Sequence, residues 1–178
     1  MDISTPPATE LRSCFDAQHR ATRAAPEVPL ALRLDRLQRI STLLDTHGAA
    51  LAAAVQADFG VRAPQLTEVA DIFVLRTLLS HTRKHLRGWM KPQRRHVDLK
   101  SFPLARNRVV PQPLGVVGII VPWNYPLYLA IGPMVAALAA GNRVMVKMSE
   151  LTPLFSALLQ QLCAQAFPVD EVCIVTGG

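Results

Sequence analysis

The sequence predicts an α/β protein in which a helical section is followed by the beginning of an open parallel sheet. The first observation is the helical spacing of apolar residues through most of positions 11–89. The second is a series of short β-branched segments after residue 113, separated by helical patterns. The third is composition: half of the residues are hydrophobic and 18% are charged, which excludes a disordered chain.

The helical section is expected to hold three helical stretches. Leu11 to Ala24 predicts the first, Leu30 to Val55 the second, and Thr67 to Trp89 one long helix or two. Gly48 is a candidate kink in the second. Leucines form a broad stripe on the second helix, and we expect its arginines largely on the opposite side: Arg33, Arg36 and Arg39. The apolar contacts expected of the third stretch come from Val69, Ile72, Phe73, Leu79 and Leu86.

A basic window follows from His81 to Arg108. It holds nine Lys or Arg residues against the single Asp98, whereas the whole chain carries a formal charge of +6. Such a window can attract an anionic partner, but it also fits a solvated face, and no nucleic-acid motif accompanies it. We therefore expect no nucleic-acid partner.

Short strands are expected between the helices and the sheet, at Val97 to Phe102 and Arg108 to Val110, around Pro103. Pro111 and Pro113 mark a boundary near residue 112. The predicted division is therefore 1–94, 95–112 and 113–178.

The last section alternates strand and helix. Gly115 to Val121 is wholly apolar, as a strand buried on both faces would be. A helix should begin at Pro126 and end in a left-handed cap at Gly141-Asn142. Val144 to Lys147 and Val172 to Val175 predict two further strands. The helix between them should be capped by Ser149 or Thr152 and run to about Phe167.

Residues 109–142 carry no charge and are numerous enough to span a bilayer. The prolines, tryptophan and asparagine inside this segment instead favour a strand, a turn and a helix, so we expect no membrane partner.

Ligands of open parallel sheets bind beyond the carboxyl ends of the strands. These ends are Pro122-Trp123-Asn124, Lys147-Met148-Ser149-Glu150 and Thr176-Gly177-Gly178. The Asn124 amide could donate to a developing oxyanion or cap the helix at Pro126. Lys147 and Glu150 could hold ribose hydroxyls or form an ordinary exposed pair.

The cysteines and histidines give weaker signals. Cys163 should pack as a small hydrophobe, and Cys14 and Cys173 lack a neighbour that would activate a thiol. His81 and His85 are spaced for one helix face but lack further ligands, so no metal site is predicted. Three cysteines without a CxxC pair favour a reducing cytoplasm.

The stretch PLGVVGIIVPWNYPLYLAIGPMVAALAAGNRVMVKMSELTP, Pro113 to Pro153, resembles the aldehyde dehydrogenase superfamily. The PWNYP turn, the AAGN helix end and the KxSE loop occur in the family's order and spacing. QADFG and HLRGWMKP, at Gln56–Gly60 and His85–Pro92, resemble the coniferyl aldehyde dehydrogenase branch. The resemblance implies an incomplete Rossmann-like parallel sheet of the aldehyde dehydrogenase fold.

The resemblance also implies roles for individual residues. Asn124 matches the catalytic asparagine that binds the aldehyde oxygen, and Pro122 and Trp123 match the nicotinamide side of the cofactor cleft. Lys147 and Glu150 match the pair that holds the adenosine ribose, with Ser149 beside them. Glu150 should disfavour a 2′-phosphate, so NAD is expected and NADP remains possible. Met148 stands where the family usually has proline.

The implied activity is oxidation of an aldehyde, aromatic and coniferaldehyde-like, to the carboxylic acid. The strands around residues 97–110 match those that extend across a homodimer interface. Nothing in the chain matches the family's nucleophilic cysteine or general-base glutamate. We therefore expect the N-terminal part of a longer enzyme, inactive alone. The alternative is a non-catalytic module that pairs with a full-length dehydrogenase subunit.

Overall fold

The computed structural model describes residues 8–98 and 100–177. Residues 1–7 of the predicted helical section, Leu99 and Gly178 lie outside the described part. The helices are α1 (Ala8–Ala24), α2 (Leu30–Phe59), α3 (Pro64–Thr67), α4 (Val74–Trp89), α5 (Pro126–Ala139) and α6 (Pro153–Ala166), with a π-helical turn at Glu68–Phe73. The strands are β1 (Gln93–Arg95), β2 (Asn107–Val109), β3 (Val116–Ile120), β4 (Arg143–Lys147) and β5 (Val172–Val175).

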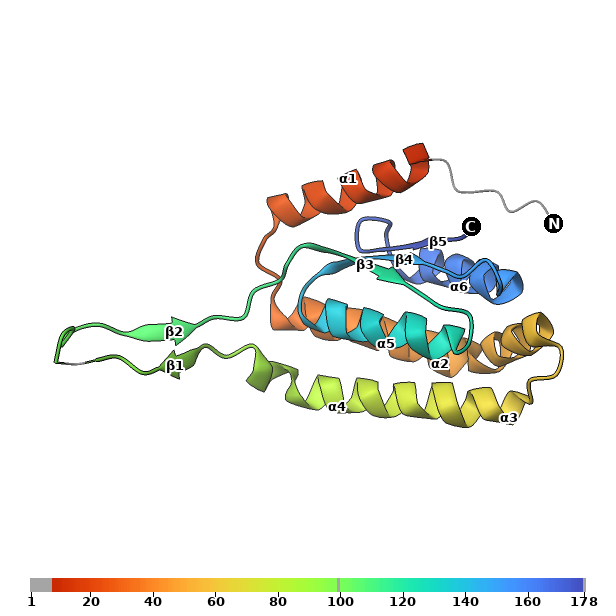
Figure 1. The fold of residues 1–178 in the computed structure, drawn as a ribbon, viewed down its shortest axis with the longest axis horizontal. Helices are drawn as coiled ribbons and strands as arrows, with labels where there is room; N and C mark the ends of the chain where they lie inside the picture. Colours follow the sequence, from red (N-terminus) through yellow and green to blue (C-terminus); the bar gives the residue numbers. More distant parts are fainter. Residues whose placement is uncertain (1–7, 99, 178) are drawn as a thin grey trace.

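The predicted parallel sheet is confirmed, with the strand order β3-β4-β5. α5 connects β3 to β4 and α6 connects β4 to β5, so each strand pair is joined by a helical crossover. Figure 1 shows α1 on one side of the sheet and α5, α6 and α2 on the other, with α4 as an outer layer. The carboxyl ends of all three strands consequently lie at one edge.

The core lies between the sheet and the helices beneath it. Val144 and Val146 of β4 are fully buried there. β3 differs from its prediction, because its last residue, Ile120, is 85% exposed. The apolar run correctly indicated a strand, but it does not report which faces are covered, and nothing in the described chain covers Ile120.

The uncharged segment folds into β3, a turn and α5, as predicted. Gly141 ends α5 with a φ of 91°, the left-handed conformation expected of the cap. Within residues 8–98 and 100–177, no helix combines the length and the apolar composition that a membrane span requires.

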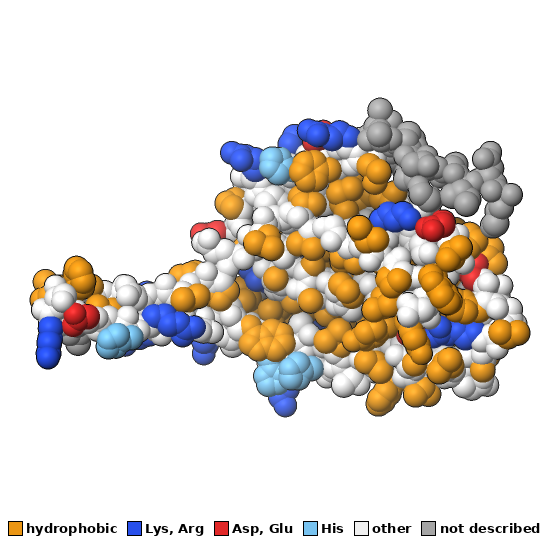
Figure 2. All heavy atoms as spheres, viewed as in Figure 1, with side chains coloured by type: hydrophobic (Ala, Val, Ile, Leu, Met, Phe, Trp, Pro, Cys, Tyr) orange, Lys and Arg blue, Asp and Glu red, His pale blue; other side chains and the backbone are white. Residues whose placement is uncertain are grey.

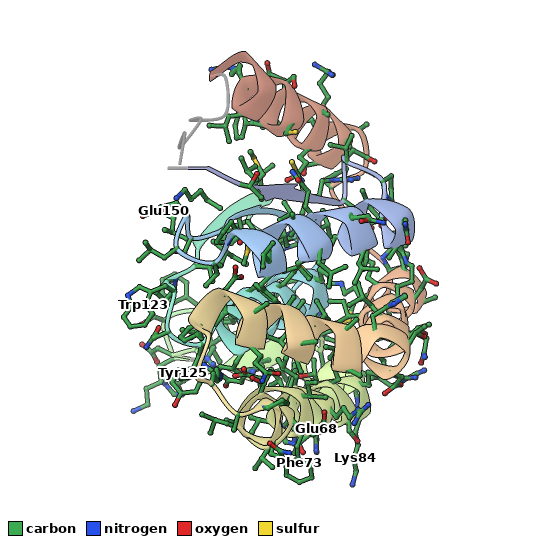
Figure 3. The ribbon with its side chains drawn as sticks, turned by 90° about the vertical axis from the view of Figure 1, so that its right-hand side faces the viewer. Glu68, Phe73, Lys84, Trp123, Tyr125 and Glu150 are labelled. Carbon is green, nitrogen blue, oxygen red and sulfur yellow. The ribbon has the colours of Figure 1, made fainter. Side chains whose placement is uncertain are left out.

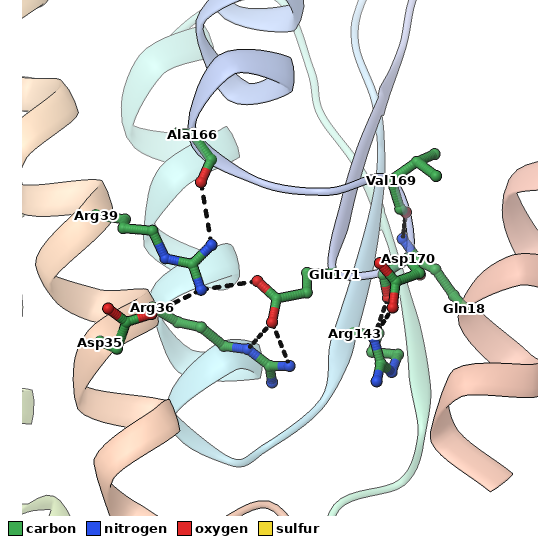
Figure 4. Close-up of polar contacts among 9 residues, drawn as sticks. All are labelled: Gln18, Asp35, Arg36, Arg39, Arg143, Ala166, Val169, Asp170 and Glu171. Carbon is green, nitrogen blue, oxygen red and sulfur yellow. Dashed lines mark hydrogen bonds and ion pairs between the residues drawn. The ribbon is translucent and has the colours of Figure 1, made fainter. Parts of the chain in front are cut away.

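α2 packs against α4, α5 and α6, so helices surround it on several sides. The prediction that its arginines lie largely opposite the buried leucine stripe is therefore wrong for two of the three, which are buried with the leucines. Arg33 is 7% exposed and Arg36 is 1% exposed. The Arg36 guanidinium donates to Glu171 Oε1 at 2.9 and 3.1 Å, and Arg39 donates to Glu171 Oε2 at 2.8 Å (Figure 4). α2 runs without a break through Gly48, which leaves room for Ile72.

The third helical stretch contains the π-helical turn, and this changes which residues are buried. A π-turn adds a residue to one helical turn and so rotates the positions before it relative to those after it. Val69 and Phe73 are each 65% exposed, which contradicts their predicted contacts, whereas Ile72, Leu79 and Leu86 are buried as predicted.

β1 and β2 form an antiparallel hairpin, with Arg94 opposite Arg108. The first strand lies earlier than predicted, because residues 96–98 and 100–106 belong to the connection between β1 and β2. Figure 1 shows this hairpin as an arm that projects from the body, and Figure 2 shows Lys and Arg side chains along it. Every residue of both strands is exposed. The pattern of apolar residues could therefore not predict where these strands begin and end.

A residue distant in sequence caps α6. Asp58, near the end of α2, accepts hydrogen bonds from the backbone N–H groups of Leu154 (3.0 Å) and Phe155 (2.9 Å). Thr152 occupies the N-cap position but its side chain makes no capping bond. The predicted N-cap position of Thr152 is therefore confirmed, but its side chain is not the cap, because the carboxylate of Asp58 accepts from the helix-end amides and also favours the positive end of the helix.

We expect Asp58→Ala to lower the free energy of unfolding by about 1–2 kcal/mol, since two helix-end amides would lose their acceptor. Urea unfolding followed by circular dichroism measures the change. Asp45→Ala is the control, because Asp45 is 57% exposed and bonds Arg76 and Ser41 at the surface, where an ion pair contributes less than about 1 kcal/mol. Equal losses in the two variants would contradict the capping role.

Candidate functional site

Hydrogen bonds hold together the carboxyl ends of the three strands, from which the predicted ligand loops begin. Val121 N donates to Lys147 O at 2.9 Å, and Met148 N donates to Val175 O at 2.8 Å. The parallel ladder therefore continues beyond β3 and β4 into the loops. Figure 3 shows Trp123, Tyr125 and Glu150 along this edge of the molecule.

Lys147 and Glu150 form a direct pair at the end of β4. Lys147 Nζ lies 3.1 Å from Glu150 Oε2, and both side chains are about one-third exposed, at 35% and 38%. The pKa of Glu150 is lowered, first by a hydrogen bond from its own backbone amide and then by Lys147. Glu150 is thus an ionised acceptor beside an ammonium donor, both open to solvent.

The two residues between this pair build the loop. Met148 is fully buried, and its backbone N–H makes the bond to Val175 O that a proline could not make. The Ser149 hydroxyl accepts from Leu151 N at 3.2 Å, and Ser149 O accepts from Thr152 N at 3.3 Å. Ser149 therefore shapes the turn into α6.

Pro122, Trp123 and Asn124 form an exposed turn between β3 and α5. Tyr125, not Asn124, is the N-cap residue of α5, and its side chain makes no capping hydrogen bond. In the described part of the chain, no group bonds the side-chain amide of Asn124, although its backbone carbonyl accepts from Arg62. The capping interpretation of Asn124 is therefore wrong for this structure, and its amide is available to a ligand.

The sequence reasoning missed Arg62, which lies just after Gly60 at the end of α2. Arg62 is 8% exposed, and its guanidinium lies 4.8 Å from the Tyr125 ring centroid. Arg62 is a charged residue two positions after Gly60, a glycine in a turn. This local sequence is typical of an exposed loop. The signal that could have found it is the acid Asp71, which lies next to the predicted core residue Ile72.

Asp71 is fully buried beside Arg62. Its Oδ2 lies 3.2 Å from Arg62 Nη2, while its Oδ1 has no hydrogen-bond partner among the described residues. Burial raises the pKa of Asp71 to about 6, and the Arg62 charge offsets only part of this rise.

A folded-state pKa of about 6 makes stability depend on pH. Because this pKa exceeds the unfolded value, the folded protein binds the proton more tightly. The contribution of protonated Asp71 to the free energy of unfolding is therefore fully present below about pH 4, and it is lost as pH rises through about 6. We expect Asp71 to lower the free energy of unfolding by about 2–3 kcal/mol across this rise. Urea unfolding at several pH values, with wild type minus Asp71→Asn as the quantity compared, tests this. Parallel pH profiles would contradict it.

The cysteines lie away from this edge. Cys163 is 1% exposed, and burial raises the pKa of its thiol to about 12. This confirms its predicted role as a small hydrophobe, because so weak an acid supplies little thiolate. Cys14 and Cys173 pack together between α1 and β5.

Comparison with known proteins agrees with this architecture. The model of the aldehyde dehydrogenase family matches residues 1–178. The chain is 45% identical to a probable coniferyl aldehyde dehydrogenase of Pseudomonas aeruginosa, covering 94% of the chain and 35% of that protein. It is 44% identical to the coniferyl aldehyde dehydrogenase of Pseudomonas sp. strain HR199, covering 96% of the chain and 35% of that protein.

A solved structure of AldH from Staphylococcus aureus has the same fold, with a TM-score of 0.89 at 24% identity over 94% of this chain and 36% of that one. This chain belongs to the aldehyde dehydrogenase family. The resemblance to the coniferyl aldehyde dehydrogenase branch is confirmed, and the chain spans about a third of the length of these curated relatives.

Proposed function

We propose that this chain supplies the oxyanion donor and the ribose-binding pair of an NAD-dependent aldehyde dehydrogenase. The reaction converts an aromatic aldehyde of the coniferaldehyde type, water and NAD⁺ into the carboxylic acid, NADH and a proton. The carrying observation is that the exposed Lys147–Glu150 pair and the free Asn124 amide share the carboxyl edge of one parallel sheet.

The residues at the end of β4 fit a dinucleotide. An ionised Glu150 can accept hydrogen bonds from both hydroxyls of a ribose, and Lys147 can donate to their oxygens. The charge of Glu150 repels a 2′-phosphate, which supports NAD over NADP. Pro122 and Trp123, on the neighbouring loop, would face the nicotinamide end. When bound, NAD supplies the acceptor for the hydride that leaves the aldehyde carbon.

Asn124 would act on the substrate itself. Its amide N–H groups are unengaged by the described protein and can donate to the aldehyde oxygen as negative charge develops there. Such a donor stabilises the transition state more than the ground state, so its loss should lower kcat more than it raises KM. The nucleophile and the base are assigned to no residue of this chain.

A chimaeric enzyme tests the proposal. In it, this chain replaces the matching third of the coniferyl aldehyde dehydrogenase of Pseudomonas sp. strain HR199. We expect the chimaera to reduce NAD with coniferaldehyde, measured by NADH absorbance, and Asn124→Ala to lower kcat by about 10²–10³-fold. Glu150→Gln is the matched control, because it should raise KM for NAD and leave kcat nearly unchanged. A chimaera that binds NAD but oxidises no aldehyde would overturn the proposal.

A second part of the proposal is that the complete enzyme is cytoplasmic and a homodimer, and the arm of β1 and β2 supports the homodimer. The strands expose their backbone edges and six arginine or lysine side chains within residues 91–108: Lys91, Arg94, Arg95, Lys100, Arg106 and Arg108. The alternative, a non-catalytic module that pairs with a full-length subunit, would use the same arm. Co-elution of the 178-residue chain with an intact relative, abolished by deletion of residues 94–108, would favour that alternative.

A further inference from the structure

Phe59 and Arg62 contact the turn that carries Asn124 at three consecutive residues, Trp123 to Tyr125. The Trp123 ring lies 6.0 Å, centroid to centroid, from the Phe59 ring. Arg62 Nη1 donates to the backbone carbonyl of Asn124 at 2.8 Å. The same guanidinium stacks on Tyr125, with its carbon 4.8 Å from the ring centroid. Phe59 and Arg62 both come from the end of α2 and the turn that follows it.

Arg62 is itself held rigidly. Its Nε donates to Thr67 Oγ1 at 3.0 Å, and its Nη2 pairs with Asp71 at 3.2 Å. The Phe59 ring centroid lies 5.3 Å from its guanidinium carbon. Each of the three guanidinium nitrogens thus has an acceptor, and the group lies near two aromatic rings. A planar fork can make all these contacts at once, whereas a lysine ammonium cannot.

The arrangement fixes the backbone of Asn124 and leaves its side chain free. This is what an oxyanion donor requires, because a preorganised donor needs no rearrangement when charge develops. We propose that Arg62 is a positioning residue, which fixes the Asn124 backbone so that the side-chain amide is presented at the carboxyl edge of the sheet. The catalytic consequence rests on the function proposed above; the fixing of the turn does not.

Nuclear magnetic resonance of the 178-residue chain labelled with ¹⁵N-asparagine tests the fixing of the turn. The chain has three asparagines, Asn107, Asn124 and Asn142. Asn142 serves as an internal standard for the fold, because its buried Oδ1 accepts from Leu114 N and Gly115 N at 2.7 and 3.0 Å. In Arg62→Lys, we expect the Asn124 backbone and side-chain signals to shift and broaden while those of Asn142 stay in place.

Arg33→Lys is the matched control. Arg33 is also a buried arginine that donates to backbone carbonyls, those of Val28 and Ala139, but it lies far from the turn. It should leave the Asn124 signals unchanged. Unchanged Asn124 signals in Arg62→Lys would overturn the proposal. If Arg62→Lys also loses the Asn142 signals, Thr67→Val replaces it, since it removes only the Nε acceptor, and the same two outcomes apply.

The effect of Arg62 on catalysis is measured in the chimaeric enzyme. Arg62→Lys should lower kcat about 10-fold to 100-fold with little change in KM for NAD, as expected for a misplaced catalytic group. Millimolar guanidinium added to Arg62→Ala should restore part of kcat, which a general loss of stability would not allow. A shifted Asn124 signal with unchanged kcat would retain the fixing of the turn and overturn its catalytic consequence. An inactive parent chimaera would overturn the proposed function alone.

Discussion

Glu171→Gln is expected to lower the free energy of unfolding by about 3–5 kcal/mol, because it leaves the buried Arg36 without a counter-charge. The Arg36 side chain is 1% exposed, and its guanidinium donates to Glu171 Oε1 at 2.9 and 3.1 Å. Arg39 is 26% exposed and keeps Asp35 and the Ala166 carbonyl as partners. Arg36 should therefore account for most of the loss.

Urea unfolding followed by circular dichroism measures this loss. Asp35→Asn is the control: Asp35 is 58% exposed, so its removal should cost less than about 1 kcal/mol. Adding Arg36→Met to Glu171→Gln should recover much of the stability, because the buried charge is removed together with its partner. A Glu171→Gln loss below about 1 kcal/mol would show that the arginine is hydrated in solution.

Gly141→Ala is expected to lower the free energy of unfolding by about 3–5 kcal/mol, through two separate effects. Gly141 has a φ of 91°, where a side chain is strained. A Cβ there would also lie 2.8 Å from the guanidinium carbon of Arg33. Arg33 cannot move freely, because it is 7% exposed and bonds Val28 O at 2.9 Å and Ala139 O at 3.1 Å.

A double-mutant cycle with Arg33→Met separates the two effects. The backbone strain should persist in the Arg33→Met background, whereas the steric part should disappear. Gly88→Ala is the control, since Gly88 lies in α4 and a Cβ added to it would meet no atom within 4 Å. This substitution should stabilise the helix by up to about 1 kcal/mol. A Gly141→Ala loss no larger than about 1 kcal/mol would contradict both effects.

The sequence predicted the features that depend on neighbouring residues. The β-branched runs placed β4 and β5, Pro126 placed the start of α5, and Gly141 placed its left-handed end. The alternating order of strand and helix then identified the ligand edge without any tertiary contact being known. The motif around Asn124 added the family, which the comparisons confirmed.

The features that it missed depend on contacts between distant residues. Arg36 looked like a solvent-facing residue, because its partner Glu171 lies 135 positions away. The cap of α6 was sought beside the helix, whereas Asp58 reaches it from 96 positions away. The π-turn interrupts the regular α-helical period, and the predicted burial of Val69 and Phe73 was therefore wrong. The helical period of apolar residues therefore predicts which side chains are buried only where the helix is a regular α-helix. It also fails where a charged side chain has a buried partner of opposite charge.

The Arg36–Glu171 pair also has a consequence for the order in which the chain can fold during synthesis. At about 5–20 residues per second, the ribosome makes Glu171 on the order of ten seconds after Arg36. Until then, burying Arg36 between α2 and its neighbours would leave a cation without a counter-charge, so α2 must stay hydrated on that side. Glu171, in the turn that leads into β5, therefore completes the charge balance of α2, which is synthesised much earlier. A nascent chain stalled before residue 171 should remain open to proteolysis in α2, and one stalled well after it should not.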